Sequence, residues 1–227
     1  MARLARIVVP DMPHHVTQRG NRRQEGFFGD EDREEYLRYV REACEQFGVA
    51  IWAWCLMPNH VHFVAVPKAE DALALCFGRA HTRYTRMINF RKQWRGFLWQ
   101  GQFASCVMDD AHAYHGLRYV ERNPVRAKLA RTPWSYRWSS AGYRVGQRRD
   151  DPLVRADDRF GQTIKDWKAY LMEGEDPEEV ALIRKETPVG RPIGDAGFIQ
   201  RMERRFGMDL FRRPPGPRPR KKKRGVR

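Results

Sequence analysis

Two histidines placed two positions apart are the first candidates for chemistry in this sequence. They are His60 and His62, inside the apolar run MPNHVHFVAV at residues 57–66. If this run is a β-strand, both imidazoles point to one face of the sheet and Val61 points to the other. Two imidazoles on one face could bind a single metal ion, or they could be half-buried histidines whose nitrogens are satisfied by backbone groups. The spacing alone leaves both interpretations open.

Tyr119 and Asn123 form a second candidate pair, in the stretch RYVERNPVRA. On a helix they lie one turn apart on the same face. Beside a metal held by two histidines, the amide oxygen of Asn123 could complete the coordination, and the phenol of Tyr119 could attack a group that the metal polarises. Imidazole and amide oxygen together suit Mg²⁺ or Mn²⁺ better than zinc. In the structural alternative, Asn123 caps a new helix that begins at Pro124.

The hydrophobic pattern predicts the elements that must position these four residues. Period-two runs predict strands, and amphipathic runs predict helices. In chain order we expect strand 14–20, helix 29–48, strand 49–57, strand 60–67, helix 71–90, two short strand pieces within 96–109, and helix 112–123 with Asp109 or Asp110 as its cap. This order is the split βαβ plan of a ferredoxin-like antiparallel sheet with helices packed on one face. The predicted fold class is therefore α+β.

The charge balance points to a polyanionic partner. The chain has 227 residues and a formal net charge of +15, and its last sixteen residues are basic and proline-rich with no acidic residue. Neutralising phosphates releases counterions, so nucleic acid is the expected partner. Arg79, Arg83 and Arg86 follow helical spacing and could contact phosphates, and Trp138 lies in an aromatic and basic segment that could stack on bases. A solvated helix face and a packed aromatic cluster are the structural alternatives.

The remaining composition excludes several classes of protein. Four cysteines are spread singly, which indicates neither a zinc site nor disulfides. The longest apolar run, AIWAWCLM, is too short to cross a bilayer, and the first residues lack the apolar core of a signal peptide. We therefore expect a cytoplasmic, nucleoid-associated protein without a membrane partner.

Five uncommon sequence segments occur in a fixed order along the chain. In these segments the sequence resembles the HUH endonucleases, and among them the REP-associated tyrosine transposases. The resemblance covers about the first 145 residues. It rests on PHHVTQRGNRRQ, WCLMPNHVHFVAVP, LWQGQF, YVERNPVRAKL and YRWSSAGY. The sequence departs from the family pattern at Glu121 and Arg122, where an apolar pair is more usual, and at Gln102, where a basic residue is common. These departures would alter local contacts with DNA, and they leave the four candidate site residues unchanged.

The resemblance implies a role for each candidate residue. It makes His60, His62 and Asn123 the ligands of a divalent metal, Mg²⁺ or Mn²⁺, and it makes Tyr119 the nucleophile. The implied activity is metal-dependent cleavage of single-stranded, hairpin-flanked DNA with REP-like elements, through a 5′-phosphotyrosine intermediate that also permits rejoining. The implied fold is the ferredoxin-like sheet that the pattern predicts.

The expected organisation has an HUH catalytic domain at residues 1–145, an accessory region at 146–211 that could bind DNA, and a disordered basic tail at 212–227. No protein partner is implied. A monomer or homodimer is expected, because a single tyrosine needs a second molecule or a hydroxyl acceptor for strand transfer. Two alternatives remain: a hairpin-binding or single-strand-binding protein without catalysis, and a hydrolase that uses metal-bound water. The hydrolase would need more carboxylates near the histidines than this region offers.

Overall fold

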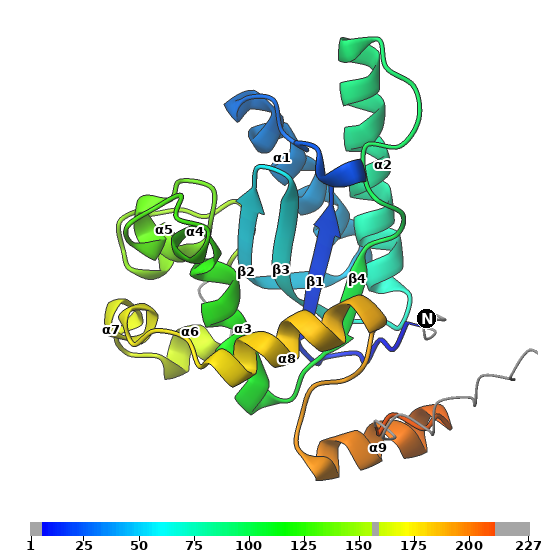
Figure 1. Cartoon of the computed structure of the whole chain (residues 1–227), viewed down its shortest axis with the longest axis vertical. Coiled ribbons are helices and arrows are strands. Elements are labelled where there is room, and N and C mark those ends of the chain that lie inside the picture. Colours follow the sequence, from blue (N-terminus) through cyan, green and yellow to red (C-terminus); the bar gives the residue numbers. More distant parts are fainter. Residues whose placement is uncertain (1–5, 156–158, 212–227) are drawn as a thin grey trace, which may run out of the picture.

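A four-stranded antiparallel sheet forms the centre of the molecule (Figure 1). The computed structural model describes residues 6–155 and 159–211. The strand order is β2-β3-β1-β4, and the strands are β1 (His14–Arg19), β2 (Val49–Met57), β3 (His60–Pro67) and β4 (Ala104–Val107). This order and the intervening helices confirm the ferredoxin-like plan. Of the two strand pieces expected within 96–109, only β4 forms, and Trp99 makes a single bridge with Gly20.

Two helices cover one face of this sheet, as predicted. They are α1 (Asp30–Phe47) between β1 and β2, and α2 (Ala72–Lys92) between β3 and β4. Leu37, Val40 and Cys44 form the buried stripe of α1, and Gly48 ends the helix in the left-handed conformation that glycine adopts most easily. Apolar side chains of both helices pack on Val61, Phe63 and other residues of this sheet face in one large core.

The opposite face of the sheet, which holds the histidine pair, is covered by α3 (Asp110–Glu121). Asp109 caps this helix by accepting a hydrogen bond from the backbone N–H of His112, as the sequence predicts. Leu117 and Val120 of α3 pack with Cys55 and Val64 of the sheet in a second core. Helices therefore lie on both faces, because α3 follows the βαββαβ unit and takes the face that α1 and α2 leave uncovered.

The break expected near Asn123 is present, one residue earlier than predicted. Helix α3 ends at Glu121 and the short helix α4 (Asn123–Arg126) follows directly, with Pro124 at its start. The capping position is Arg122 and makes no side-chain capping bond, so Asn123 is not the N-cap that the structural alternative proposes. The backbone between Tyr119 and Asn123 stays close to helical, with φ −86° and ψ −2° at Arg122.

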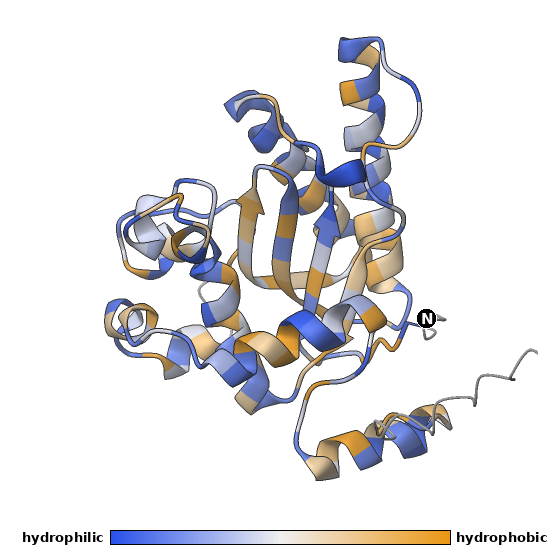
Figure 2. Cartoon of the chain, in the orientation of Figure 1, coloured by the Kyte–Doolittle hydropathy of each residue, from blue (hydrophilic) through white to orange (hydrophobic). Residues whose placement is uncertain are grey.

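Short helices after α4 surround α3 and the edge of the sheet (Figure 1). Figure 2 shows that β2 and β3 are mainly hydrophobic, whereas β1, α8 and α9 each carry both hydrophobic and hydrophilic residues. None of the described helices combines the length and apolar character needed to cross a bilayer. The predicted tail at 212–227 lies outside the described residues. The remaining elements are η1 (Asn21–Arg23), η2 (Pro133–Ser135), α5 (Ala141–Arg144), α6 (Arg159–Thr163), α7 (Trp167–Met172), α8 (Pro177–Glu186), η3 (Thr187–Val189) and α9 (Ala196–Phe206).

Candidate active site

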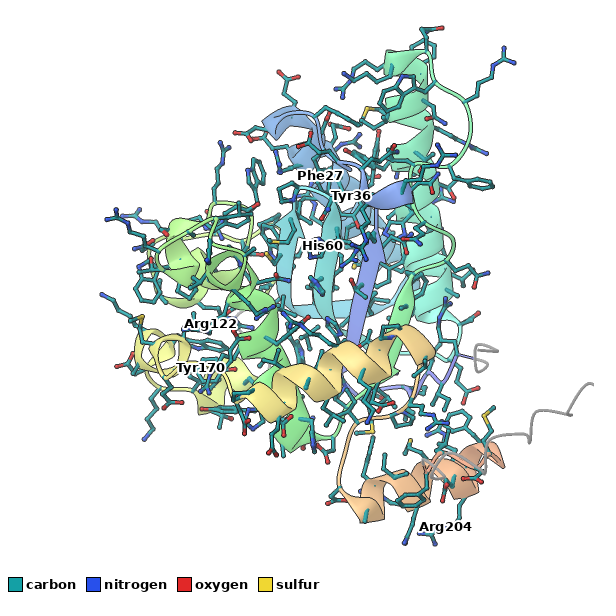
Figure 3. All side chains as sticks on the ribbon, in the orientation of Figure 1. Phe27, Tyr36, His60, Arg122, Tyr170 and Arg204 are labelled. Carbon is teal, nitrogen blue, oxygen red and sulfur yellow. The ribbon has the colours of Figure 1, made fainter. Side chains whose placement is uncertain are left out.

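The two histidines of β3 lie side by side at the end of the sheet where β3 begins; Figure 3 labels His60 there. Their ring centroids are 4.9 Å apart, and the rings are nearly perpendicular. Across the sheet, His60 pairs with Arg19 and His62 with Thr17 of β1. His62 is buried and His60 is partly exposed. The strand alternation thus places both imidazoles on one face, as expected.

A third histidine, His15 of β1, joins this pair. Its Nε2 is 2.9 Å from Nδ1 of His62, and the two rings are nearly parallel, with their centroids 5.1 Å apart and 12° between their planes. Its Nδ1 is 2.8 Å from the hydroxyl of Thr187, which belongs to the region after residue 145. His15 is not among the residues predicted from the sequence, although its place in HHVTQR puts it on one face of a predicted strand. The sequence does not give the register between β1 and β3, and this register brings His15 close to His62.

Tyr119 reaches the histidines from the helix above them. Its ring meets the rings of His15 and His62 edge to face, at centroid distances of 5.4 and 5.6 Å. The side chain is 6% exposed. Asn123 is also buried and opens α4, which contacts β2. The structure therefore brings the predicted nucleophile into contact with His62, one of the two predicted histidines, and with His15.

Positive charge lies against Tyr119. The guanidinium of Arg126 is 4.1 Å from the centre of the Tyr119 ring, and its Nη2 donates to the backbone carbonyl of Tyr119. Arg126 is also ion-paired with Glu175, and Arg122 lies 3.7 Å from the same carboxylate. Glu175 is about fifty positions away from both arginines, so this group of charges could not be predicted from the sequence.

The imidazoles of the site are held in their neutral form. Burial, and to a smaller extent the nearby charges of Arg19 and Arg126, lower the pKa of His60 to about 4. Burial and the neighbouring histidines hold the pKa of His62 well below its usual value, and burial lowers that of His15 to about 3. Neutral imidazole is the form that gives a lone pair to a metal ion.

The donor set fits a small divalent cation. Among the described residues, no group of three histidine, cysteine, aspartate or glutamate side chains is arranged as a metal site. A cation here would therefore depend on His60, His62 and an amide oxygen, for which Asn123 stays the predicted source. Two neutral nitrogens and one oxygen leave several positions for water and phosphate, which suits Mg²⁺ or Mn²⁺.

The predicted DNA-binding residues lie away from the histidines. Arg79 and Arg86 are exposed on α2, behind the opposite face of the sheet. Arg83 on the same helix is ion-paired with Glu42 and stacks over a tyrosine ring. Trp138 is 9% exposed and packs into the core beside α1. Contact with DNA at these positions stays a prediction, and the ring of Trp138 would have to be uncovered to stack on a base.

Three exposed aromatic side chains that the sequence analysis did not select gather at the end of α2 and just after it. They are Phe90 (81% exposed), Trp94 (45%) and Phe97 (84%), in the segment FRKQWRGF. Phe97 lines two neighbouring cavities of about 500 and 360 Å³. The arginines that line these cavities are Arg6, Arg22, Arg86 and Arg95, and no carboxylate lines either one. The alternation of aromatic and basic residues in this segment is the sequence feature from which this exposed surface could have been predicted.

The sheet places both histidines of β3 on the face that the tyrosine-bearing helix α3 covers, which is the arrangement that the resemblance to HUH proteins implies. Residues 8–123 match the family described as "Transposase IS200 like", which is half of the chain, and the protein belongs to this family.

One solved structure supports the same fold. The chain is similar to a REP-associated tyrosine transposase bound to a REP hairpin, with 19% identity and a TM-score of 0.55 over 70% of this chain and 93% of that one. A proposed transposase from Deinococcus radiodurans R1 shows 19% identity and a TM-score of 0.38, over 56% of this chain and 92% of the other. No curated protein matches the chain.

Proposed function

We propose that this protein is a metal-dependent endonuclease and strand transferase for single-stranded DNA, with Tyr119 as the nucleophile. The observation that carries the proposal is the contact of the Tyr119 ring with the rings of His15 and His62. A tyrosine used only for packing needs no such neighbours. The family supports transposition and DNA binding in general, and the cleavage chemistry is our inference from the site.

The reaction would be a transesterification. The phenol oxygen of Tyr119 attacks the scissile phosphorus, the bond from phosphorus to the 3′ oxygen breaks, and the phenolic proton leaves to solvent or to the departing 3′ oxygen. The products are a 5′-phosphotyrosine and a free 3′-hydroxyl, so the bond energy is conserved and rejoining needs no ATP. Arg126, over the Tyr119 ring, places a positive charge beside the phosphate. A divalent cation held by His60, His62 and Asn123 would stabilise negative charge on a non-bridging oxygen.

Single-stranded DNA is the substrate that suits this geometry. Tyr119 is only 6% exposed, so the scissile phosphate has to enter the site to be attacked in line. A single strand can bend to do so, whereas a duplex holds each phosphate on its helical path. The similar REP-associated transposase was solved with a REP hairpin, and we extend hairpin-flanked DNA to this chain as its substrate class. Each chain offers one such tyrosine, so strand transfer requires a second protomer or a hydroxyl acceptor.

The direct test is a covalent adduct. Labelled single-stranded hairpin DNA, incubated with the full chain and Mn²⁺, should give a protein–DNA species that survives denaturing electrophoresis. Tyr119→Phe should abolish the adduct, whereas Tyr114→Phe, on the same helix, should keep it. Cleavage without an adduct would point to a hydrolase that uses water. If the protein binds the DNA but gives neither cleavage nor an adduct, it is a DNA-binding protein without catalysis.

A non-catalytic hairpin-binding protein is the second candidate, and one observation favours it. The arginines beside Tyr119 are already occupied by carboxylates, Arg126 and Arg122 by Glu175 and Arg118 by Glu173. A phosphate must displace these carboxylates before it reaches the phenol. If the adduct does not form even at high Mn²⁺ and DNA concentrations, this second function is the better one.

A further inference from the structure

Each of the two histidines on β3 has a hydrogen-bond partner at Nδ1. For His60 the partner is the side-chain oxygen of Asn59, 2.6 Å away. For His62 it is Nε2 of His15, 2.9 Å away. A neutral imidazole carries its proton on one nitrogen and a lone pair on the other. The partner at Nδ1 therefore decides whether Nε2 can bind a metal ion.

The tautomer of His60 follows from the orientation of Asn59. The amide nitrogen of Asn59 donates to the backbone carbonyl of Arg23 at 3.2 Å, so the amide oxygen is the atom that faces His60. An amide oxygen only accepts. His60 must then donate from Nδ1, and its lone pair lies on Nε2.

The tautomer of His62 depends on a longer chain of hydrogen bonds. Nδ1 of His15 is 2.8 Å from the Thr187 hydroxyl oxygen, which is 3.2 Å from the sulfur of Cys106. A hydroxyl both donates and accepts, so the chain has two arrangements. In the first, His62 donates to His15, and His15 donates to Thr187. In the second, every bond is reversed and His62 carries its proton on Nε2, where it blocks a metal.

We propose that Asn59, His15 and Thr187 are positioning residues that hold both histidines of β3 as Nδ1–H tautomers and so present two Nε2 lone pairs to one divalent cation. The rings of His15 and His62 are nearly parallel, with 12° between their planes, so the same hydrogen bond also orients the ring of His62. Partners of this kind commonly orient metal-bound imidazoles, and their loss costs about 10- to 100-fold in metal affinity. This inference rests on the proposed function, since it names how that site is prepared for its cation.

The proposal gives the accessory region a role. Thr187 is buried at the start of η3, which packs on β4 and β1, so it reaches His15 from far along the chain. Region 146–211 would then complete the site by holding the outer end of the hydrogen-bond chain.

The first test reads the tautomers directly, in full-length protein freed of metal with a chelator. Nitrogen-15 NMR of the histidine rings at neutral pH should show His60 and His62 as Nδ1–H tautomers. In Thr187→Val, His15 loses its acceptor and should move its proton to Nε2, which donates to His62 and shifts His62 toward Nε2–H. Thr187→Ser keeps the hydroxyl and should keep the wild-type tautomer. Asn59→Ala should change the tautomer of His60 alone.

The second test measures Mn²⁺ binding by titration calorimetry. We expect the Kd to rise about tenfold or more in Thr187→Val and in His15→Phe, and to stay within about twofold of wild type in Thr187→Ser. His14→Gln is the matched control, because His14 is a buried neighbour on β1 that bonds to Val9 and Met12 instead of the site. It should leave the tautomer of His62 and the Mn²⁺ affinity unchanged.

The outcomes separate this inference from the proposed function. An Nε2–H tautomer of His62 in wild type, or an unchanged tautomer in both Thr187→Val and His15→Phe, would overturn the positioning role. The tautomers are read without metal or DNA. A protein with the expected tautomers but no Tyr119 adduct would therefore contradict the proposed cleavage and leave the positioning role standing.

Discussion

At the residue scale, the guanidinium of Arg126 has two partners with opposite consequences. It lies 4.1 Å from the centre of the Tyr119 ring, where it can stabilise a bound phosphate. It is also ion-paired with Glu175, whose side chain is largely shielded from solvent. The Glu175 carboxylate neutralises the Arg126 guanidinium, which a DNA phosphate would otherwise contact. The pair should therefore weaken DNA binding as well as order the site.

Glu175→Gln should increase affinity for single-stranded DNA. The substitution frees Arg126 and Arg122 for a phosphate, and we expect about two- to fivefold tighter binding at moderate salt. The dependence of log K on log salt should become steeper by about one unit, because one more phosphate is neutralised. Fluorescence anisotropy across a salt series measures both quantities.

Glu70→Gln is the control for this prediction, because it removes the same charge elsewhere. Glu70 is an exposed residue just beyond β3, paired with Arg205 at 3.1 Å, at the opposite end of the strand from His60. If Glu70→Gln tightens DNA binding as much as Glu175→Gln, the effect comes from net charge alone and the ion pair at Arg126 has no special role.

At the element scale, the end of α2 exposes aromatic side chains among basic ones, and we expect it to contact unpaired bases. The helix extends beyond the sheet (Figure 1). It ends where Gln93 adopts a left-handed conformation, and the segment that follows presents Trp94 and Phe97 to solvent. Exposed aromatic rings beside arginines are the usual platform for single strands. The two cavities next to Phe97, lined by arginines and free of carboxylates, match this chemistry.

Phe97→Ala should weaken binding of single-stranded DNA by about 5- to 150-fold, since stacking of one base contributes about 1–3 kcal/mol. Binding of a blunt duplex should change much less, because its bases are already stacked on each other. Leu75→Ala is a matched control: Leu75 is also an exposed apolar residue of α2, near its other end. Equal losses for the single strand and the duplex would contradict a stacking role.

At the scale of the whole molecule, buried histidines connect stability to pH. Burial lowers the pKa of His81 to about 3, and its ring lies 3.0 Å from the Tyr36 hydroxyl in the core beneath α1 and α2. Burial likewise lowers the pKa of His14 to about 4. In the unfolded chain these groups bind protons near the ordinary value of 6.5, so protonation favours unfolding. Their contribution to stability is complete above about pH 6.5 and is lost as the pH falls toward 3.

The free energy of unfolding should therefore decrease between about pH 6.5 and pH 5, before most carboxylates titrate. In His81→Gln the slope of this decrease should be smaller by up to about 1.4 kcal/mol per pH unit, which corresponds to one proton. Urea unfolding followed by circular dichroism at several pH values measures the slope. The absolute stability of the variant does not affect the comparison. An unchanged slope in His81→Gln would show that His81 is not neutral in the folded state.

The sequence by itself determined the local features of this protein. Strand alternation put His60 and His62 on one face, the apolar stripe and Gly48 defined α1, and Asp109 marked the start of α3. These features depend on neighbours within a few positions, where backbone geometry alone sets the direction of a side chain. The order of the elements was sufficient to predict the ferredoxin-like sheet and, with the ordered blocks, the family.

Only the tertiary structure decided which distant side chains complete the site. His15 meets His62 because of the register between β1 and β3, and Thr187 meets His15 through a segment far along the chain. Arg83 is paired within the protein and Trp138 is buried, although both looked available for DNA. Spacing along a chain gives no information about such contacts. They are fixed when separate elements pack together, and that packing is the sum of many weak interactions over the whole molecule.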